Sequence, residues 1–178
     1  MKSQRHFFQN ASGEKLGARL DLPDGSPRAC ALFAHCFTCS KNLKAVGNIS
    51  QALTEEGIAV LRFDFTGLGE SEGDFADTNF SSNVADLISA ADFLKSELDA
   101  PRILIGHSLG GAAVLQAAAD IPSVLAVATI GAPAEPSHVT RLLASERATI
   151  EAEGEAEVNL AGRTFRIKKQ FLDDLDRA

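Results

Sequence analysis

Apolar runs alternate with segments of helical periodicity along the first 130 residues of the chain. Three short apolar runs, at 30–34, 58–65 and 102–105, are each followed by a loop and then by helical spacing, at 46–53, 84–94 and 111–119. A further apolar run covers 124–130. Strands without polar alternation are typical of a parallel sheet with both faces buried. The order predicts an α/β fold with a mainly parallel sheet and helices on both faces.

The two ends of the chain add other elements. Two β-like runs at 5–9 and 15–22 predict an opening hairpin, and turn residues at 22–25 end the second run. After residue 133 the pattern predicts a helix at 137–147, an acidic stretch at 151–157, a small hairpin (158–160 and 164–167) and a final helix from 168. We expect residues 1–133 to form the core and residues 134–178 a lid-like addition.

Charge and composition exclude several classes of function. The 178 residues carry 17 Lys plus Arg against 24 Asp plus Glu, a formal charge of −7, without a basic cluster. A nucleic-acid partner is therefore not expected, because such affinity needs concentrated positive charge. We find neither a signal-peptide pattern nor an apolar run of roughly 20 residues, so we expect a cytoplasmic protein without a membrane span. In that setting the three cysteines are expected to be reduced thiols.

The strongest candidate for chemistry is the G-x-S-x-G sequence Gly106-His107-Ser108-Leu109-Gly110, at a predicted strand-to-helix turn. The glycines allow a turn sharp enough to lift the Ser108 hydroxyl out of the sheet. The Leu109 amide, at a helix N-terminus, can donate to a developing oxyanion. The alternative is a glycine-rich turn with a surface serine. We predict that Ser108 is a catalytic nucleophile.

A second oxyanion donor is expected from the loop after the 30–34 strand, where the Phe37 amide is the candidate. This loop, the segment 62–71 (RFDFTGLGES) and the elbow at 106–111 occur in an order and spacing that resembles the α/β-hydrolase superfamily. The loop at 35–39 (HCFTC) and the hairpin at 161–165 (AGRTF) are more closely similar to the hydrolase domain of bacterial proteins fused to an OsmC-like peroxide-reductase domain.

The resemblance implies an esterase-like serine hydrolase that acts on small-molecule acyl substrates without cofactor or metal. It also implies supporting roles: His35 shapes the oxyanion loop, His107 belongs to the elbow, and Asp64 holds the loop after its strand by hydrogen bonds. One departure lies at Cys36, where many family members have glycine.

The larger departure is in the strand count. The family fold has eight strands, with the catalytic acid after the seventh and the histidine after the eighth, whereas six strands are predicted here. The resemblance thus implies a fold truncated before its last two strands, and supplies no triad histidine or acid. His138, in the lid-like part, is a candidate base within the chain, while the other histidines are interpreted as structural.

An apolar edge strand at 124–130 would follow from this truncation, and natural proteins seldom leave such edges bare. We therefore expect a fragment of a longer chain, whose missing strands and OsmC-like domain form a C-terminal partner, or a homo-oligomer that pairs at this edge.

Weaker signals leave alternatives open. Cys36 and Cys39 form a C-x-x-C that fits either a thiol redox pair or two small residues beside the oxyanion donor. Zinc lacks further ligands, and the glycines at 67, 69 and 73 do not have dinucleotide-loop spacing. Alternating glutamates at 151–157 fit a solvated face better than a cation site. Three functions remain: a serine hydrolase within a longer chain, a non-catalytic scaffold that associates through its edge, and a thiol redox domain.

Overall fold

The core of the protein is a single six-stranded sheet. The computed structural model describes residues 1–160 and 162–178. The strands are β1 (Lys2–Gln9), β2 (Lys15–Leu22), β3 (Ala29–Ala34), β4 (Ile58–Phe63), β5 (Ile103–His107) and β6 (Ala126–Ile130). Their order across the sheet is β1-β2-β4-β3-β5-β6. The pairs β1–β2 and β2–β4 are antiparallel, and the remaining pairs are parallel. The predicted α/β fold with an opening hairpin is confirmed.

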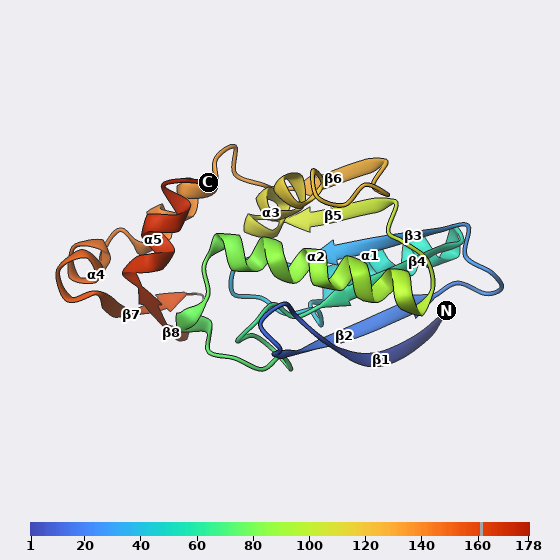
Figure 1. Cartoon of the computed structure of the whole chain (residues 1–178), viewed down its shortest axis with the longest axis horizontal. Helices are drawn as coiled ribbons and strands as arrows, with labels where there is room; N and C mark the ends of the chain where they lie inside the picture. Colours follow the sequence, from blue (N-terminus) through green and yellow to red (C-terminus); the bar gives the residue numbers. More distant parts are fainter. Residues whose placement is uncertain (161) are drawn as a thin grey trace.

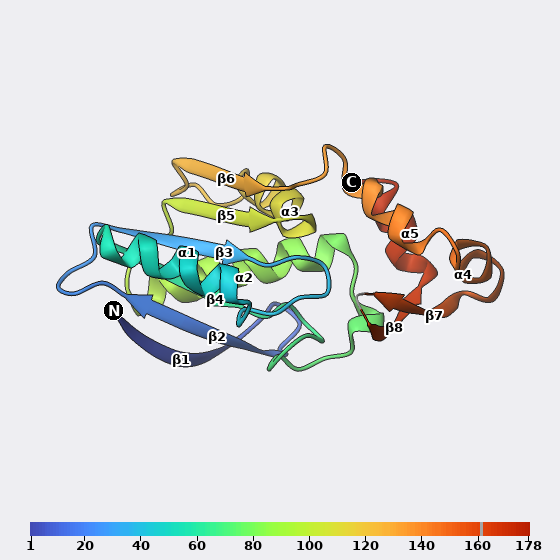
Figure 2. The ribbon, with the colours of Figure 1, turned by 180° about the vertical axis from the view of Figure 1, so that it is seen from behind.

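Helices cover both faces of this sheet. Helices α2 (Phe80–Glu97) and α3 (Leu109–Ala117) lie on the face seen in Figure 1, and α1 (Lys44–Glu55) lies on the face seen in Figure 2. Every residue of β4 is buried, because this central strand packs on both layers. A capping box in which Asn79 and Ser82 exchange side-chain and backbone hydrogen bonds fixes the start of α2.

The C-terminal region, residues 134–178, lies beyond the carboxyl ends of the parallel strands (Figure 1). Its elements are the 3₁₀ helix η2 (Pro136–Leu143), α4 (Arg147–Glu153), β7 (Glu155–Leu160), β8 (Arg163–Lys168) and α5 (Lys169–Leu175). A further 3₁₀ helix, η1 (Phe75–Asp77), contacts β8. Phe75 packs on Phe165 with ring centroids 4.9 Å apart, so apolar side chains of this region join the main core.

Most predicted elements of the C-terminal region are observed, with one correction. The hairpin and the final helix form as expected, although Ala161 in the predicted turn lies outside the described residues. A single helix over 137–147 is wrong: η2 ends at Leu143 and α4 begins separately at Arg147. Only Val139 and Leu143 of η2 are buried, so this segment packs through little more than one turn, too short to favour a continuous α-helix.

Strand β6 forms the open edge of the sheet in the described part of the chain. It pairs with β5 on one side only, and most of its residues are exposed. Leu125, just before it, is 76% exposed, and Ile130 at its end is 42% exposed. None of the helices in the described residues has the length and apolarity to cross a membrane.

Candidate active site

Ser108 occupies the sharp connection between β5 and α3. It follows the half-buried His107, the last residue of β5, and has φ +55° and ψ −125°, a backbone conformation that costs a non-glycine residue about 1–3 kcal/mol. The turn is possible because glycines flank it. A Cβ atom at Gly106 would lie 2.3 Å from the carbonyl oxygen of Gly110. The two motif glycines therefore let strand and helix approach closely, and Ser108 is presented between them.

Residues 35–41, the loop predicted to supply the second oxyanion donor and called the oxyanion loop below, pack directly on this elbow. A Cβ atom at Gly110 would be 2.3 Å from the carbonyl oxygen of His35, so the two backbones are in contact. Neither the Phe37 amide nor the Leu109 amide donates a hydrogen bond to another described residue. The Ser108 hydroxyl likewise has no hydrogen-bond partner among the described residues. Two unengaged backbone donors and an unengaged hydroxyl thus come from adjacent loops.

The side chain of Phe37 anchors the oxyanion loop in the protein. It is buried and packs between Phe75, at 5.4 Å between ring centroids, and Phe171 of α5, which stacks on it at 4.9 Å. On the same loop, the carbonyl of Thr38 accepts a hydrogen bond of 3.1 Å from Nη1 of Arg163 in β8. The C-terminal region therefore contributes to the position of the loop.

His35 is buried at the start of the oxyanion loop. Its Nδ1 donates a 2.8 Å hydrogen bond to the Cys36 carbonyl, whereas the buried Nε2 has no partner and lies 3.8 Å from Oδ1 of Asp64. Burial lowers the pKa of His35 below its ordinary value, outweighing the hydrogen bond to Cys36 and the charge of Asp64. A neutral imidazole that bonds its own loop restricts the backbone beside Phe37.

Asp64, directly after β4, is fully buried and collects hydrogen bonds from two loops. Its Oδ1 accepts from the Lys41 amide at 2.7 Å, and its Oδ2 accepts from the Glu70 amide at 3.0 Å. The Lys41 ammonium, only 1% exposed, pairs with Asp64 and, at 2.7 Å, with Oε2 of Glu70. Arg62 completes the set by donating to the Lys41 carbonyl at 2.7 Å. The far end of the oxyanion loop is therefore tied to the loop after β4.

Lys41 is the buried neighbour of the predicted site that the sequence did not reveal. A lysine in a polar loop, 23 positions before Asp64, carries no local signal of burial or of pairing. Only the crossing of the two loops at the carboxyl edge of the sheet brings them together.

The structure also corrects the expectation of reduced thiols. Cys36 and Cys39 form a disulfide, and Cys30 in β3 is a buried free thiol. The backbone turn explains the pairing: the Cys39 amide donates to the Cys36 carbonyl at 3.1 Å, which brings the two Cα atoms to 5.3 Å, within the range that a disulfide spans.

A cavity of about 300 Å³ opens over the elbow. Ser108 and Leu109 line it from the elbow, and His138 and Arg141 line it from η2. The structure thus brings His138 to the same cavity as Ser108, although the two residues are far apart in sequence. The remaining lining is mainly apolar, from Gly131, Pro133, Val139 and Leu142.

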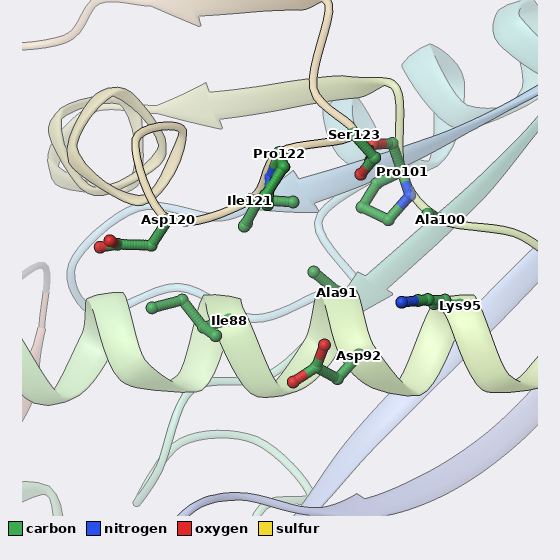
Figure 3. Close-up of a pocket in the computed structure, with 10 residues that line it drawn as sticks. All are labelled: Ile88, Ala91, Asp92, Lys95, Ala100, Pro101, Asp120, Ile121, Pro122 and Ser123. Carbon is green, nitrogen blue, oxygen red and sulfur yellow. Dashed lines mark hydrogen bonds between the residues drawn. The ribbon is translucent and has the colours of Figure 1, made fainter.

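A second cavity, of about 320 Å³, lies between α2 and the segments that precede β5 and β6 (Figure 3). It is at the amino end of β5, opposite to Ser108. The Ser123 hydroxyl on its wall donates to the Pro101 carbonyl at 2.7 Å and so is already engaged. None of the predicted site residues lines this cavity.

Several known proteins resemble this chain in structure or in sequence. The esterase domain of a Rhodothermus marinus protein is 56% identical, with a TM-score of 0.74, and the match covers 99% of this chain and 69% of that one. Monoglyceride lipase from Rattus norvegicus is 30% identical over 116 residues, 64% of this chain and 38% of its own length. Mitochondrial palmitoyl-protein thioesterase ABHD10 from Mus musculus is 32% identical over 142 residues, 75% of this chain and 46% of its own length.

The chain spans less than half the length of these two curated relatives. A family profile described as serine aminopeptidase, S33 matches residues 25–153, well over half of the chain. Together with the sheet order and the elbow, this match shows the family. The chain belongs to the serine aminopeptidase S33 family of α/β-hydrolases.

Proposed function

We propose that the chain carries the nucleophile and oxyanion hole of a serine hydrolase for esters or related acyl compounds. The observation that carries the proposal is the elbow: Ser108 has a positive φ between two close-packed glycines, and its hydroxyl has no partner among the described residues. In family hydrolases of this kind such a turn presents a nucleophile.

In the proposed reaction, Oγ of Ser108 attacks the acyl carbonyl while its proton passes to a base. The amides of Leu109 and Phe37 donate to the oxyanion of the tetrahedral intermediate. Collapse of this intermediate breaks the bond to the leaving alcohol, which takes the proton, and water then releases the acyl group from Ser108. Each amide donor of this kind is worth about 100- to 1000-fold in rate.

The proposed reaction also needs a base and an acid. We place them outside residues 1–178, in the portion of the related esterase domain that this chain does not cover. His138 is the candidate within the chain, because it lines the same cavity as Ser108. In this interpretation the C-terminal region acts as a lid over the acyl pocket, and Arg141 and Leu142 belong to its wall.

The relatives support an acyl ester or thioester substrate. Two of them are named a monoglyceride lipase and a palmitoyl-protein thioesterase, and a third is an esterase domain. Esters and thioesters share the carbonyl chemistry that Ser108 and two amide donors would serve, so we propose this substrate class. The cytoplasmic location, the bacterial origin and the OsmC-like partner stay predictions of the sequence.

Covalent labelling with a fluorophosphonate, followed by intact mass, tests the nucleophile. The 178-residue chain, a form extended by the coding sequence that follows it, and Ser108→Ala versions of both are compared. Ser96→Ala, an exposed serine at the end of α2, is the matched control. We expect labelling of the extended form that Ser108→Ala abolishes and Ser96→Ala leaves intact. No labelling in either form would overturn the proposal.

A His138→Ala variant locates the base. If the 178-residue chain labels and His138→Ala slows it by about 100-fold or more, the magnitude typical of a general base, the base lies within the chain. If labelling needs the extended form and His138→Ala has no effect, the base lies outside it.

The second candidate function is a non-catalytic scaffold, and the exposed edge at β6 favours it. Leu125 and Ile130 offer apolar surface beside unpaired backbone groups, a combination that recruits another strand. The occupant would be the C-terminal strands of a longer chain, or a second copy. Sedimentation of the 178-residue chain tests this: a soluble, monodisperse monomer counts against it.

A further inference from the structure

We propose that Cys36 and Cys39 are a reversible thiol–disulfide site that sets the activity of the adjacent oxyanion donor. The proposal rests on the proposed hydrolase function, because Phe37, the residue it controls, lies between the two cysteines in the chain. The two cysteines form a modification site within the oxyanion loop, with low-molecular-weight disulfides and thiols as reaction partners.

The first support is the geometry of the loop. The disulfide and the hydrogen bond from the Cys39 amide to the Cys36 carbonyl close the same four-residue turn. Phe37 and Thr38 are the two residues inside this turn, so the direction of the Phe37 amide depends directly on whether the turn is closed. An oxyanion donor is effective only when it is held in place before the reaction.

The second support is accessibility. Cys36 and Cys39 are both half-buried, so a small thiol or disulfide can reach them. Cys30 is different: it is 2% exposed, and burial raises the pKa of its thiol above the ordinary value. Disulfide exchange needs an accessible thiolate, and therefore only the pair in the oxyanion loop is suited to it.

The third support is that the effect of the bond is local. A disulfide between residues three positions apart closes a short loop, for which the stabilisation of the whole fold is at the low end. The loop is also held elsewhere, through Phe37 between two aromatic rings and through Arg163 on the Thr38 carbonyl. Reduction should therefore loosen the turn and leave the fold intact.

Oxidation of the pair by glutathione takes two exchange steps. One protein thiolate attacks a sulfur of oxidised glutathione, forms a mixed disulfide and releases one glutathione thiolate. The second protein thiolate attacks the protein sulfur of this mixed disulfide, so that the Cys36–Cys39 bond forms and a second glutathione leaves. The two protein thiols lose two electrons and two protons, and these convert one oxidised glutathione to two reduced molecules.

The first measurement is a thiol count by intact mass. The protein is equilibrated with oxidised or reduced glutathione, quenched with acid, unfolded and alkylated with N-ethylmaleimide. Of the three cysteines, we expect one alkylated residue after oxidation and three after reduction. In Cys39→Ser, oxidised glutathione should leave a mixed disulfide on Cys36, which identifies the exchange. Three alkylated residues in both states would overturn the proposal.

The second measurement is the rate of fluorophosphonate labelling of Ser108 in the two redox states, in whichever form of the protein labels faster. We expect the oxidised form to react about 10-fold faster, less than the 100-fold or more that follows loss of an oxyanion donor, because reduction loosens the amide without removing it. After either treatment, a Cys36→Ala/Cys39→Ala variant should react at the rate of the chemically reduced wild-type protein. Cys30→Ala should keep the full difference between the oxidised and reduced forms.

The outcomes are separable from those of the proposed function. Equal labelling rates in the oxidised and reduced wild-type protein would overturn the redox control while leaving Ser108 as the nucleophile. No labelling in either state would overturn the hydrolase and the control of its rate together. The comparison uses wild-type protein, so it stands even where the double variant does not fold.

Discussion

The loops after β4 and β5 lie at the same edge of the sheet, yet different forces hold them. After β4, the carboxylate of Asp64 is surrounded by amides and by the ammonium of Lys41, and Arg62 links this group to the oxyanion loop. After β5, the elbow is fixed by contact between backbones that only glycine permits at positions 106 and 110. One loop is organised by buried charge and the other by shape.

The difference fits the tasks proposed for the two loops. A carboxylate or ammonium close to Ser108 would bond its hydroxyl and hold it away from the substrate. Steric fixation avoids this, since it positions Ser108 without a polar partner among the described residues. The charges that hold the oxyanion loop from its far end lie after β4, which β3 separates from β5. The comparison predicts that the two loops respond to different kinds of substitution.

The largest effect is expected for Asp64→Asn. The change removes the charge that compensates the buried Lys41 and leaves it with Glu70 alone. Loss of one member of a buried ion pair costs about 3–5 kcal/mol, so we expect a loss of about 4 kcal/mol in the free energy of unfolding by urea titration. Asp24→Asn, at a fully exposed aspartate, is the control. Equal effects of the two changes would mean that buried charge does not hold this loop.

The elbow should respond to shape instead. Gly110→Ala would put a Cβ atom 2.3 Å from the His35 carbonyl oxygen, so the oxyanion loop has to move. We expect a loss of about 3 kcal/mol, at the upper end of overpacking effects, together with slower labelling of Ser108. Gly47→Ala in α1 is the matched control, because its Cβ would meet only Arg62 Nη1, at 4.0 Å. That change should stabilise the helix by up to about 1 kcal/mol; a similar gain at Gly110 would refute the steric account.

The sheet, its helices and the glycine-flanked elbow after β5 were largely predictable from the sequence. Apolar runs and helical spacing are local properties, and they gave the sheet, its helices and the opening hairpin. The G-x-S-x-G elbow was also local, since its glycines and Ser108 lie within five consecutive positions. The loop at 35–41 also follows a strand, as predicted, and its role as an oxyanion donor stays a prediction.

The buried ion pair of Lys41 with Asp64 was not predictable, because the two residues are distant in sequence. Nothing in the neighbourhood of Lys41 distinguishes it from a solvated lysine, and its burial depends on how two loops cross. His138 reached the Ser108 cavity through η2, whose extent the helical pattern overestimated. The prediction of reduced thiols was wrong for another reason. It followed from the expected cytoplasmic compartment, whereas the geometry of the turn brings Cys36 and Cys39 together.

Among the buried charged groups, Asp21 should give the hydrogen bond from Ser50 a pH-dependent effect on stability. Its hydroxyl donates to Oδ2 of Asp21 at 2.6 Å, and Arg62 donates to the same carboxylate. Burial raises the pKa of Asp21, but hydrogen bonds from Arg62, Ser3 and Ser50 outweigh it and hold the pKa below the ordinary 3.8. A depressed pKa means that the stabilisation is complete above about pH 4, and is lost as the pH falls through the folded-state value.

Ser50→Ala should therefore cost about 2 kcal/mol at pH 7, the value of a hydrogen bond to a charged group, and less once Asp21 is protonated. Urea titrations of wild type and variant at several pH values from 7 down to 2 give this difference. Ser96→Ala, at the exposed end of α2, should show a small effect at every pH. If the loss of stability in Ser50→Ala were the same at every pH, the contribution of the Ser50 hydroxyl would not depend on the charge of Asp21.

The smallest effect is expected for Arg5→Ala, at the exposed edge of the group formed by Asp64, Lys41 and Glu70. Arg5 donates to Oε1 of Glu70 at 2.7 Å, but both side chains are exposed, and exposed pairs contribute little to stability. The pKa of Glu70 is lowered chiefly by its hydrogen bond with Lys41 and by the charge of Lys41, and less by the charge of Arg5. An NMR titration of the Glu70 carboxyl in Arg5→Ala should therefore still find a depressed pKa, with an unchanged urea midpoint. A return of that pKa to its ordinary value would mean that the exposed Arg5, and not the buried Lys41, lowers the pKa of Glu70.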